Sequence, residues 1–195
     1  MESSAAMRKP QEQAFAPQSP PTPPGLVRRM AVGLYDLIMF LAICMVATLL
    51  LVALDSGKDL QAFYADHPIV KLAYQTGLML LGYAFFGGFW IHGGQTIGMR
   101  AWGLQVTCMD GSKLDWRRAL IRYLTMLIPW MLLLLAAELL AAGGYAGKRI
   151  YMVSSGVALL LSAVGFLWPA FDPQRLAWHD RLSSTHLVRP GKRRT

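Results

Sequence analysis

Cysteine is scarce in this chain, which has only Cys44 and Cys108 among its 195 residues. Two cysteines cannot form the disulfide framework of a small secreted protein, and neither has a Cys or His neighbour at metal-ligand spacing. The common enzyme signatures are also missing, including Gly-x-Ser-x-Gly, a phosphate-binding loop and His-Glu-x-x-His. We therefore expect no enzymatic activity, no cofactor and no metal centre.

Apolar residues, in contrast, make up 54% of the chain, and the mean hydropathy is +0.37. Most of them gather in four blocks, residues 30–54, 69–91, 119–142 and 150–170. Each block is close to the roughly 20 residues that a helix needs to cross a bilayer. A soluble protein would instead spread its apolar residues at amphipathic periods. The sequence therefore predicts an all-α membrane protein with four transmembrane helices.

Acidic residues are few, with 11 Asp and Glu against 19 Lys and Arg, so the formal net charge is +8. In a soluble protein this excess would indicate nucleic acid as a partner. Here the basic residues cluster before the first block, between the second and third, and after the fourth. Lys and Arg are enriched in cytoplasmic loops, so we expect both termini to face the cytoplasm and no nucleic acid to bind.

The same features divide the chain into three predicted parts. Residues 1–27 are rich in Pro, Gln, Ser and Ala, and we expect a disordered cytoplasmic tail because they cannot bury enough apolar surface to fold. Residues 28–189 contain the four apolar blocks and are predicted to form one transmembrane domain. Residues 190–195 form a short basic C-terminal tail.

Between the second and third blocks, the chain alternates apolar and polar residues at 104–108 and then reaches Asp110-Gly111. Alternation followed by Asp-Gly is typical of a short strand and a turn. Asp115 stands where the N-cap of the third helix is expected. Residues 185–188 are the other candidate strand outside the membrane, so we predict that the two strands pair on the cytoplasmic side.

Asp36 is the most conspicuous charged residue, because it lies within the first apolar block. An ionised carboxylate in hydrocarbon costs several kcal/mol or more unless something compensates it. Arg29 projects from nearly the same helix face but about 10 Å away along the axis, too far for a direct pair unless its side chain folds inward. We therefore expect Asp36 to face Arg100, Arg118 or Arg122, or a water-filled pocket.

Several of these positions form one pattern with their neighbours: Arg29, Ala31, Asp36, Gly94 to Arg100, Gly103 to Val106, Asp110, Gly111, Arg118, Ala119, Arg122, Trp178, His179, Asp180 and Thr185. This pattern resembles the RDD family of bacterial membrane proteins. The resemblance covers residues 26–188 and departs modestly from the family at Tyr35 and Met99, where members commonly carry an aliphatic residue and a lysine. By motif, the arginine and two aspartates of the family name correspond to Arg29, Asp36 and Asp180.

The resemblance implies a multi-pass protein of the bacterial inner membrane whose activity is related to transport, with monovalent cation/proton exchange as the specific expectation. The charged set would serve ion or proton coupling, or alternatively would be a structural charge network that locks the helices. Its members are Arg29, Asp36, Arg100, Arg118, Arg122 and Asp180.

The competing hypothesis is a non-catalytic membrane factor that binds a partner protein or anionic lipid through its basic cytoplasmic face and its proline-rich tail. Beyond the bilayer itself, the expected partners are anionic lipid headgroups and either further copies of the chain or another membrane protein. Glu138, near the outer end of the third block, is expected to be an interfacial group that reaches water.

Overall fold

The computed structural model describes residues 22–54, 67–146 and 149–189. Its elements, in chain order, are α2 (Leu26–Leu54), α4 (Pro68–Gly93), α5 (Ile97–Ala101), β1 (Gln105–Cys108), α6 (Trp116–Ala146), α7 (Arg149–Phe171), α8 (Trp178–Leu182) and β2 (Thr185–Val188). Residues 1–21 and 190–195, which we assigned to the two tails, lie outside the described residues.

Four helices, α2, α4, α6 and α7, are long and apolar enough to cross a membrane. The predicted fold class, mostly helical with four candidate spans, is therefore confirmed. Two of the helices begin before their apolar blocks and carry arginine pairs in their first turns. These are α2, which includes Arg28 and Arg29, and α6, which includes Arg117 and Arg118.

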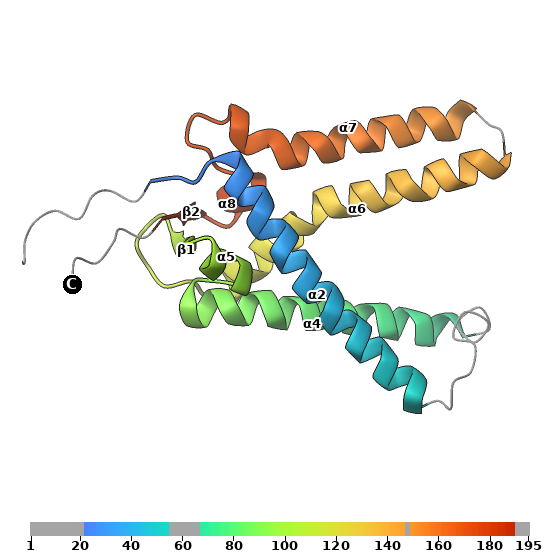
Figure 1. The fold of residues 1–195 in the computed structure, drawn as a ribbon, viewed down its shortest axis with the longest axis horizontal. Coiled ribbons are helices and arrows are strands. Elements are labelled where there is room, and N and C mark those ends of the chain that lie inside the picture. Colours follow the sequence, from blue (N-terminus) through green and yellow to red (C-terminus); the bar gives the residue numbers. More distant parts are fainter. Residues whose placement is uncertain (1–21, 55–66, 147–148, 190–195) are drawn as a thin grey trace, which may run out of the picture.

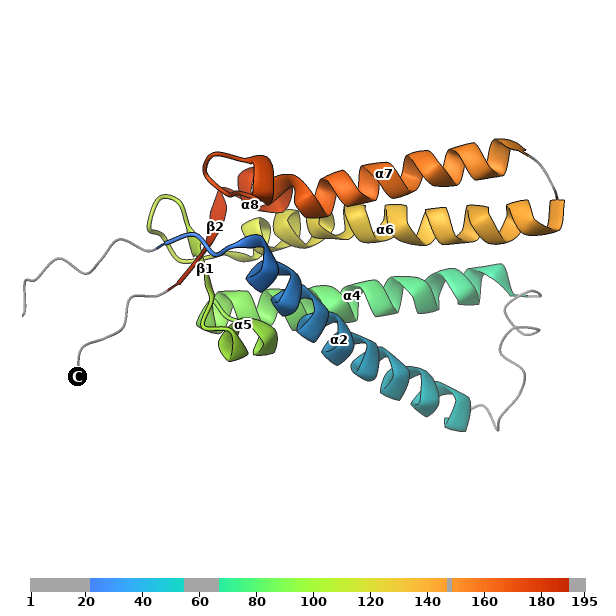
Figure 2. The same cartoon turned by 45° about the horizontal axis from the view of Figure 1, so that its top comes forward.

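The four long helices converge at one end of the molecule and spread apart toward the other (Figure 1). Helices α6 and α7 lie side by side as an antiparallel pair, α4 contacts α6, and α2 crosses α4 at an angle (Figure 2). The short elements α5, α8, β1 and β2 all gather where the helices converge. We call this part of the molecule the sheet end.

The two strands pair as predicted, forming a two-stranded antiparallel sheet. The register aligns Gln105 with Val188 and Cys108 with Thr185. Asp115 also caps α6 as expected, because its Oδ1 accepts a hydrogen bond from the Arg118 N–H at 2.9 Å. The sheet joins the segment between α4 and α6 to the segment after α8.

Both ends of the described chain also meet at the sheet end. Thr22 forms an isolated antiparallel bridge with Arg189, whose N–H donates to the Thr22 carbonyl at 3.2 Å. Helix α2 then begins at Leu26, so the chain has regular structure ahead of residue 28, where we had placed the domain boundary.

Apolar burial is concentrated at the sheet end. The core joins side chains from α2, α4, α6, both strands and the segments between them: Val32, Phe86, Trp90, Met99, Leu104, Val106, Cys108, Leu114, Ala119, Tyr123 and Leu187. Along the rest of the long helices, large apolar side chains such as Leu50, Leu134 and Leu160 are exposed. An outward apolar surface of this kind suits contact with lipid.

Two glycines let elements of the sheet end approach closely. A Cβ added at Gly82 of α4 would lie 2.4 Å from the Tyr123 hydroxyl and 2.9 Å from the Phe40 ring. A Cβ added at Gly98 of α5 would lie 2.8 Å from the Val32 carbonyl oxygen. These contacts are shorter than side chains tolerate, so glycine permits the crossings of α4 with α2 and α6 and of α5 with α2.

Candidate functional site

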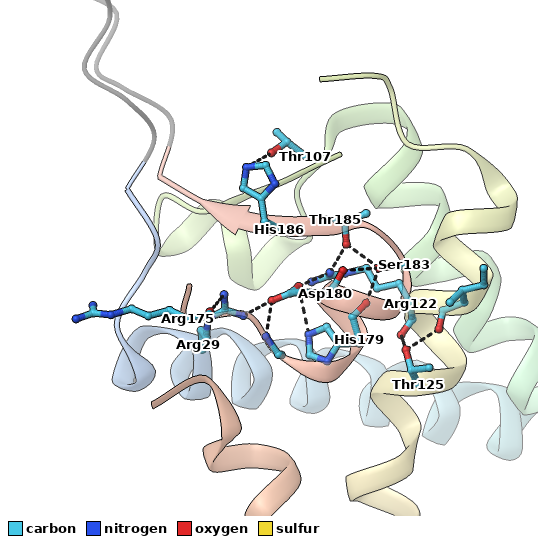
Figure 3. A network of polar contacts seen from close by, with 12 residues as sticks. Arg29, Thr107, Arg122, Thr125, Arg175, His179, Asp180, Ser183, Thr185 and His186 are labelled. Atoms are coloured by element: carbon cyan, nitrogen blue, oxygen red, sulfur yellow. Dashed lines mark hydrogen bonds and ion pairs between the residues drawn. The ribbon is translucent and has the colours of Figure 1, made fainter. Parts of the chain in front are cut away.

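A cluster around Asp180 joins parts of the chain that are far apart in sequence (Figure 3). The Asp180 side chain on α8 is fully buried. Its Oδ2 accepts a hydrogen bond from Arg29 Nη1 of α2 at 2.7 Å, and its Oδ1 accepts one from Arg122 Nη1 of α6 at 2.5 Å. One carboxylate therefore binds two guanidinium groups that come from two candidate spans.

Further polar contacts extend this cluster to the backbone and to β2. Arg29 Nη2 donates to the Arg175 carbonyl at 2.7 Å, and the Ala177 N–H donates to Asp180 Oδ2 at 3.0 Å. Arg122 also donates to the Thr185 hydroxyl at 2.8 Å, and its guanidinium lies 5.2 Å from the centre of the Trp90 ring. The cluster thus ties α2, α4, α6, α8 and β2 together.

Electrostatics within the cluster favour an ionised Asp180 beside a neutral His179. Burial by itself raises the pKa of Asp180, but the facing Arg122 and Arg29 outweigh it and hold that pKa below its usual value. For His179, burial is the largest cause and lowers the imidazole pKa to about 4. Its Nε2 lies 3.7 Å from Asp180 Oδ1, so it borders the cluster as a neutral ring near neutral pH.

Asp36 forms a second and chemically different centre. It lies on α2 and is only 5% exposed. Its Oδ2 accepts a hydrogen bond from the Thr96 hydroxyl at 2.5 Å, and its Oδ1 accepts one from the Gly98 N–H at 2.9 Å. Within the described part of the chain, no Lys, Arg or His forms an ion pair with it.

The prediction that an arginine faces Asp36 is therefore wrong for each of the three candidates. Arg100 is exposed on α5. Arg118 instead binds Asp110 through an ion pair of 2.8 Å at the surface, and Arg122 binds Asp180. The short α5 brings a hydroxyl and an amide to Asp36 at the place where we expected a cation.

The six charged residues of the predicted site consequently divide into separate groups. Arg29, Arg122 and Asp180 share one cluster, Asp36 stands with Thr96 and Gly98, and Arg100 and Arg118 belong to neither centre. Glu138 is exposed on α6, and its contact with water stays a prediction. Among the residues that the structure describes, no three His, Cys, Asp or Glu side chains gather as a metal-binding group.

Sequence reasoning missed Thr96 as a partner of Asp36, although a local signal was present. Thr96 precedes the first residue of α5, and its hydroxyl accepts a hydrogen bond from the Met99 N–H at 3.1 Å. Threonine is a preferred residue at such an N-cap. The pattern could have revealed the short helix, but no periodicity relates a helix cap to a carboxylate 60 positions earlier.

Comparison with protein-family models identifies the family of this chain. The family model described as RDD family matches residues 23–184, which is most of the chain. The chain belongs to the RDD family. Comparisons with curated proteins and with solved structures gave no match.

The match to the RDD family model confirms the resemblance that the sequence suggested. Together with the four apolar helices, it identifies the chain as a membrane protein. Of the three residues singled out by that resemblance, Arg29 and Asp180 form one ion pair, while Asp36 belongs to the other centre. In this RDD protein, therefore, one aspartate is neutralised by arginines and the other is held by neutral donors.

Proposed function

We propose that this RDD protein exchanges monovalent cations for protons across the membrane, with Asp36 as the coupling group. The observation that carries the proposal is the environment of that carboxylate. Asp36 is buried in a candidate span, and its described hydrogen-bond donors, Thr96 and Gly98, are both neutral. An ionisable residue in such a position marks an ion or proton pathway in many transporters.

The chemistry follows from charge balance at a single carboxylate. In a low-dielectric site without a facing guanidinium, a carboxylate gains stability by taking up either a proton or a small cation. Both ligands use the same oxygens, so binding of one opposes binding of the other. Competition of this kind is the simplest basis for exchange. Asp180 does not suit this role, because Arg29 and Arg122 already neutralise it.

In this proposal the protein has no enzymatic activity and needs no cofactor, and the Asp180 cluster is structural. The protein resides in a bacterial inner membrane with the sheet end in the cytoplasm. Two features support this orientation. Exposed basic residues such as Arg100, Lys113 and Arg117 lie at the sheet end, and cytoplasmic segments are enriched in Lys and Arg. Both ends of the described chain also lie there.

A flux assay on purified protein in liposomes tests the exchange. A pH gradient is imposed, and a trapped pH-sensitive dye reports its dissipation when Na⁺ or K⁺ is added. We expect cation-dependent dissipation by the wild type and none by Asp36→Asn, which removes the charge while keeping the side-chain shape. Glu138→Gln is the matched control, because it also removes a carboxylate from a candidate span but at an exposed position. Absence of wild-type flux, or full flux by Asp36→Asn, would refute the proposal.

A second candidate function, binding of anionic lipid headgroups, is favoured by the surface of the sheet end. Arg100, Lys113, Arg117 and Arg175 are exposed there, whereas Asp110 is already paired with Arg118. Three tryptophans of the segments around them are also more than a third exposed: Trp102, Trp116 and Trp168. Cations beside exposed indoles suit the headgroup layer of a membrane.

Native mass spectrometry of protein extracted from mixed membranes tests this second candidate. The wild type should retain phosphatidylglycerol in preference to phosphatidylcholine, and the combined replacements Arg100→Gln and Arg117→Gln should reduce that preference. Equal retention of the two lipids by the wild type would contradict the idea.

A further inference from the structure

Helix α5 is held on α2 by both oxygens of Asp36. The Thr96 hydroxyl donates to one oxygen at 2.5 Å, and the Gly98 N–H donates to the other at 2.9 Å. The same Thr96 hydroxyl accepts the Met99 N–H at 3.1 Å and so caps α5. One hydroxyl therefore serves the carboxylate and the short helix together.

The position of α5 depends on contacts of this kind, because five residues are too few to form a stable helix alone. Its segment is bounded by Gly94 and Gly103, whose φ values of +66° and +62° lie in the left-handed region. At Gly98 the segment comes so close to α2 that a Cβ there would lie 2.8 Å from Asp36 Oδ1. The hydrogen bonds to Asp36 thus act at the closest approach of the two helices.

We propose that Thr96 is a positioning residue that couples the charge on Asp36 to the placement of α5. Hydrogen bonds to an ionised carboxylate are roughly twice as strong as those to a neutral carboxyl group. A charged Asp36 therefore holds α5 closed on α2, and protonation releases it. The inference builds on the proposed function, because it gives the proton taken up by Asp36 a structural consequence.

Other charged groups on the elements around Asp36 are engaged, exposed or distant. On α2 itself, Arg29 is paired with Asp180, and Arg28 precedes Asp36 by eight residues, about 12 Å along the helix axis. The remaining Lys, Arg and His residues of α4, α5 and α7 are the exposed Lys71, His92, Arg100 and Arg149. Lys71 lies in the first turn of α4 and Arg149 is the first residue of α7, and both helices begin at the end opposite the sheet. Asp36 is therefore the group whose titration acts directly on α5.

Amide hydrogen exchange of the full-length protein in lipid nanodiscs tests the coupling. Exchange of residues 97–103 is followed between pH 5 and 9, with times corrected for the intrinsic effect of pH, and peptides from β2 report that the fold is intact. In the wild type we expect α5 to exchange at least about tenfold faster at the acidic end. In Asp36→Asn it should exchange fast at every pH.

Two replacements of Thr96 separate positioning from simple support. Thr96→Ser keeps the hydroxyl and should retain the pH response of the wild type. Thr96→Val keeps the shape without the hydroxyl and should reduce that response to the part that the Gly98 N–H alone provides. If Thr96 only supported α5, Thr96→Val would speed exchange but leave the pH response at its full size, and this result would overturn the proposal. A wild type whose α5 exchange is independent of pH would do the same.

The flux assay distinguishes failure of this inference from failure of the proposed exchange. A pH response of α5 without cation-dependent flux would refute the exchange and leave the coupling standing. Flux that depends on Asp36 without any response of α5 would refute the coupling alone.

Discussion

Replacing Asp180 should destabilise the protein more than replacing either arginine that binds it. Asp180→Asn keeps the size of the side chain but removes its charge. It leaves the guanidinium groups of Arg29 and Arg122 together without a counter-charge, and their side chains are only 8% and 2% exposed. Removing one partner of a buried ion pair typically costs about 3–5 kcal/mol. We expect a loss in this range in the free energy of unfolding.

Removing Arg122 has a different and smaller consequence. In Arg122→Met, Asp180 still accepts hydrogen bonds from Arg29 at 2.7 Å and from the Ala177 N–H at 3.0 Å. The carboxylate therefore stays compensated, and methionine can still pack on Trp90. The expected loss is about 1.5–3 kcal/mol, the usual range for a hydrogen bond to a charged group. Asp180→Asn should therefore lower the free energy of unfolding more than Arg122→Met, because two arginines share the single carboxylate of Asp180.

Equilibrium unfolding in mixed micelles, with SDS as the denaturant, provides the assay. Asp110→Asn is the matched control, because it also removes an aspartate from an arginine pair but at a surface position, where the Asp110 side chain is 53% exposed. Little change is expected there. The reasoning would be refuted if Asp180→Asn cost no more than Asp110→Asn, or less than Arg122→Met.

Two further predictions concern packing and pH. An added Cβ at Gly82 would lie 2.4 Å from the Tyr123 hydroxyl, whereas one at Gly88 meets nothing within 4 Å. In the same micelle assay, Gly82→Ala should therefore lower the free energy of unfolding by about 1–3 kcal/mol, and Gly88→Ala should change it little. Equal losses in the two variants would contradict the close approach of α4 to α6 at Gly82. The pKa of His179 is lowered from 6.5 to about 4, chiefly by burial, so the unfolded chain takes up this proton first as the pH falls. The free energy of unfolding should therefore fall by on the order of 2–3 kcal/mol between pH 6.5 and pH 4. If His179→Gln showed the same dependence of stability on pH, His179 would not be its cause.

Much of the architecture could be predicted from the sequence because it depends on local properties. The length of an apolar block decides whether a helix can cross a bilayer, and all four blocks of sufficient length became long helices. The pairing of β1 with β2 could also be predicted, because alternation marked one strand and few other segments outside the membrane could supply the second.

The charged site was predicted only in part. Asp36 could be recognised, because a carboxylate in an apolar block is anomalous by itself. Asp180 follows the last apolar block and was named only by the resemblance to the RDD family. Their partners could not be assigned, because Arg29 meets Asp180 from 151 positions away and Arg122 meets it from 58. The spacing of residues along one helix does not indicate which of several arginines will contact a carboxylate on another helix.

The sequence by itself indicated a membrane protein that resembles the RDD family, with four candidate spans and one carboxylate, Asp36, in need of compensation. Composition and the length of the apolar blocks carry this information, because they decide whether a segment favours lipid or water. Only the tertiary structure decided that Asp180 takes both arginines while Asp36 receives a hydroxyl and an amide from α5. The physical reason is that a hydrogen bond forms only when donor and acceptor lie within about 3 Å of each other. Which groups come that close depends on how the helices cross.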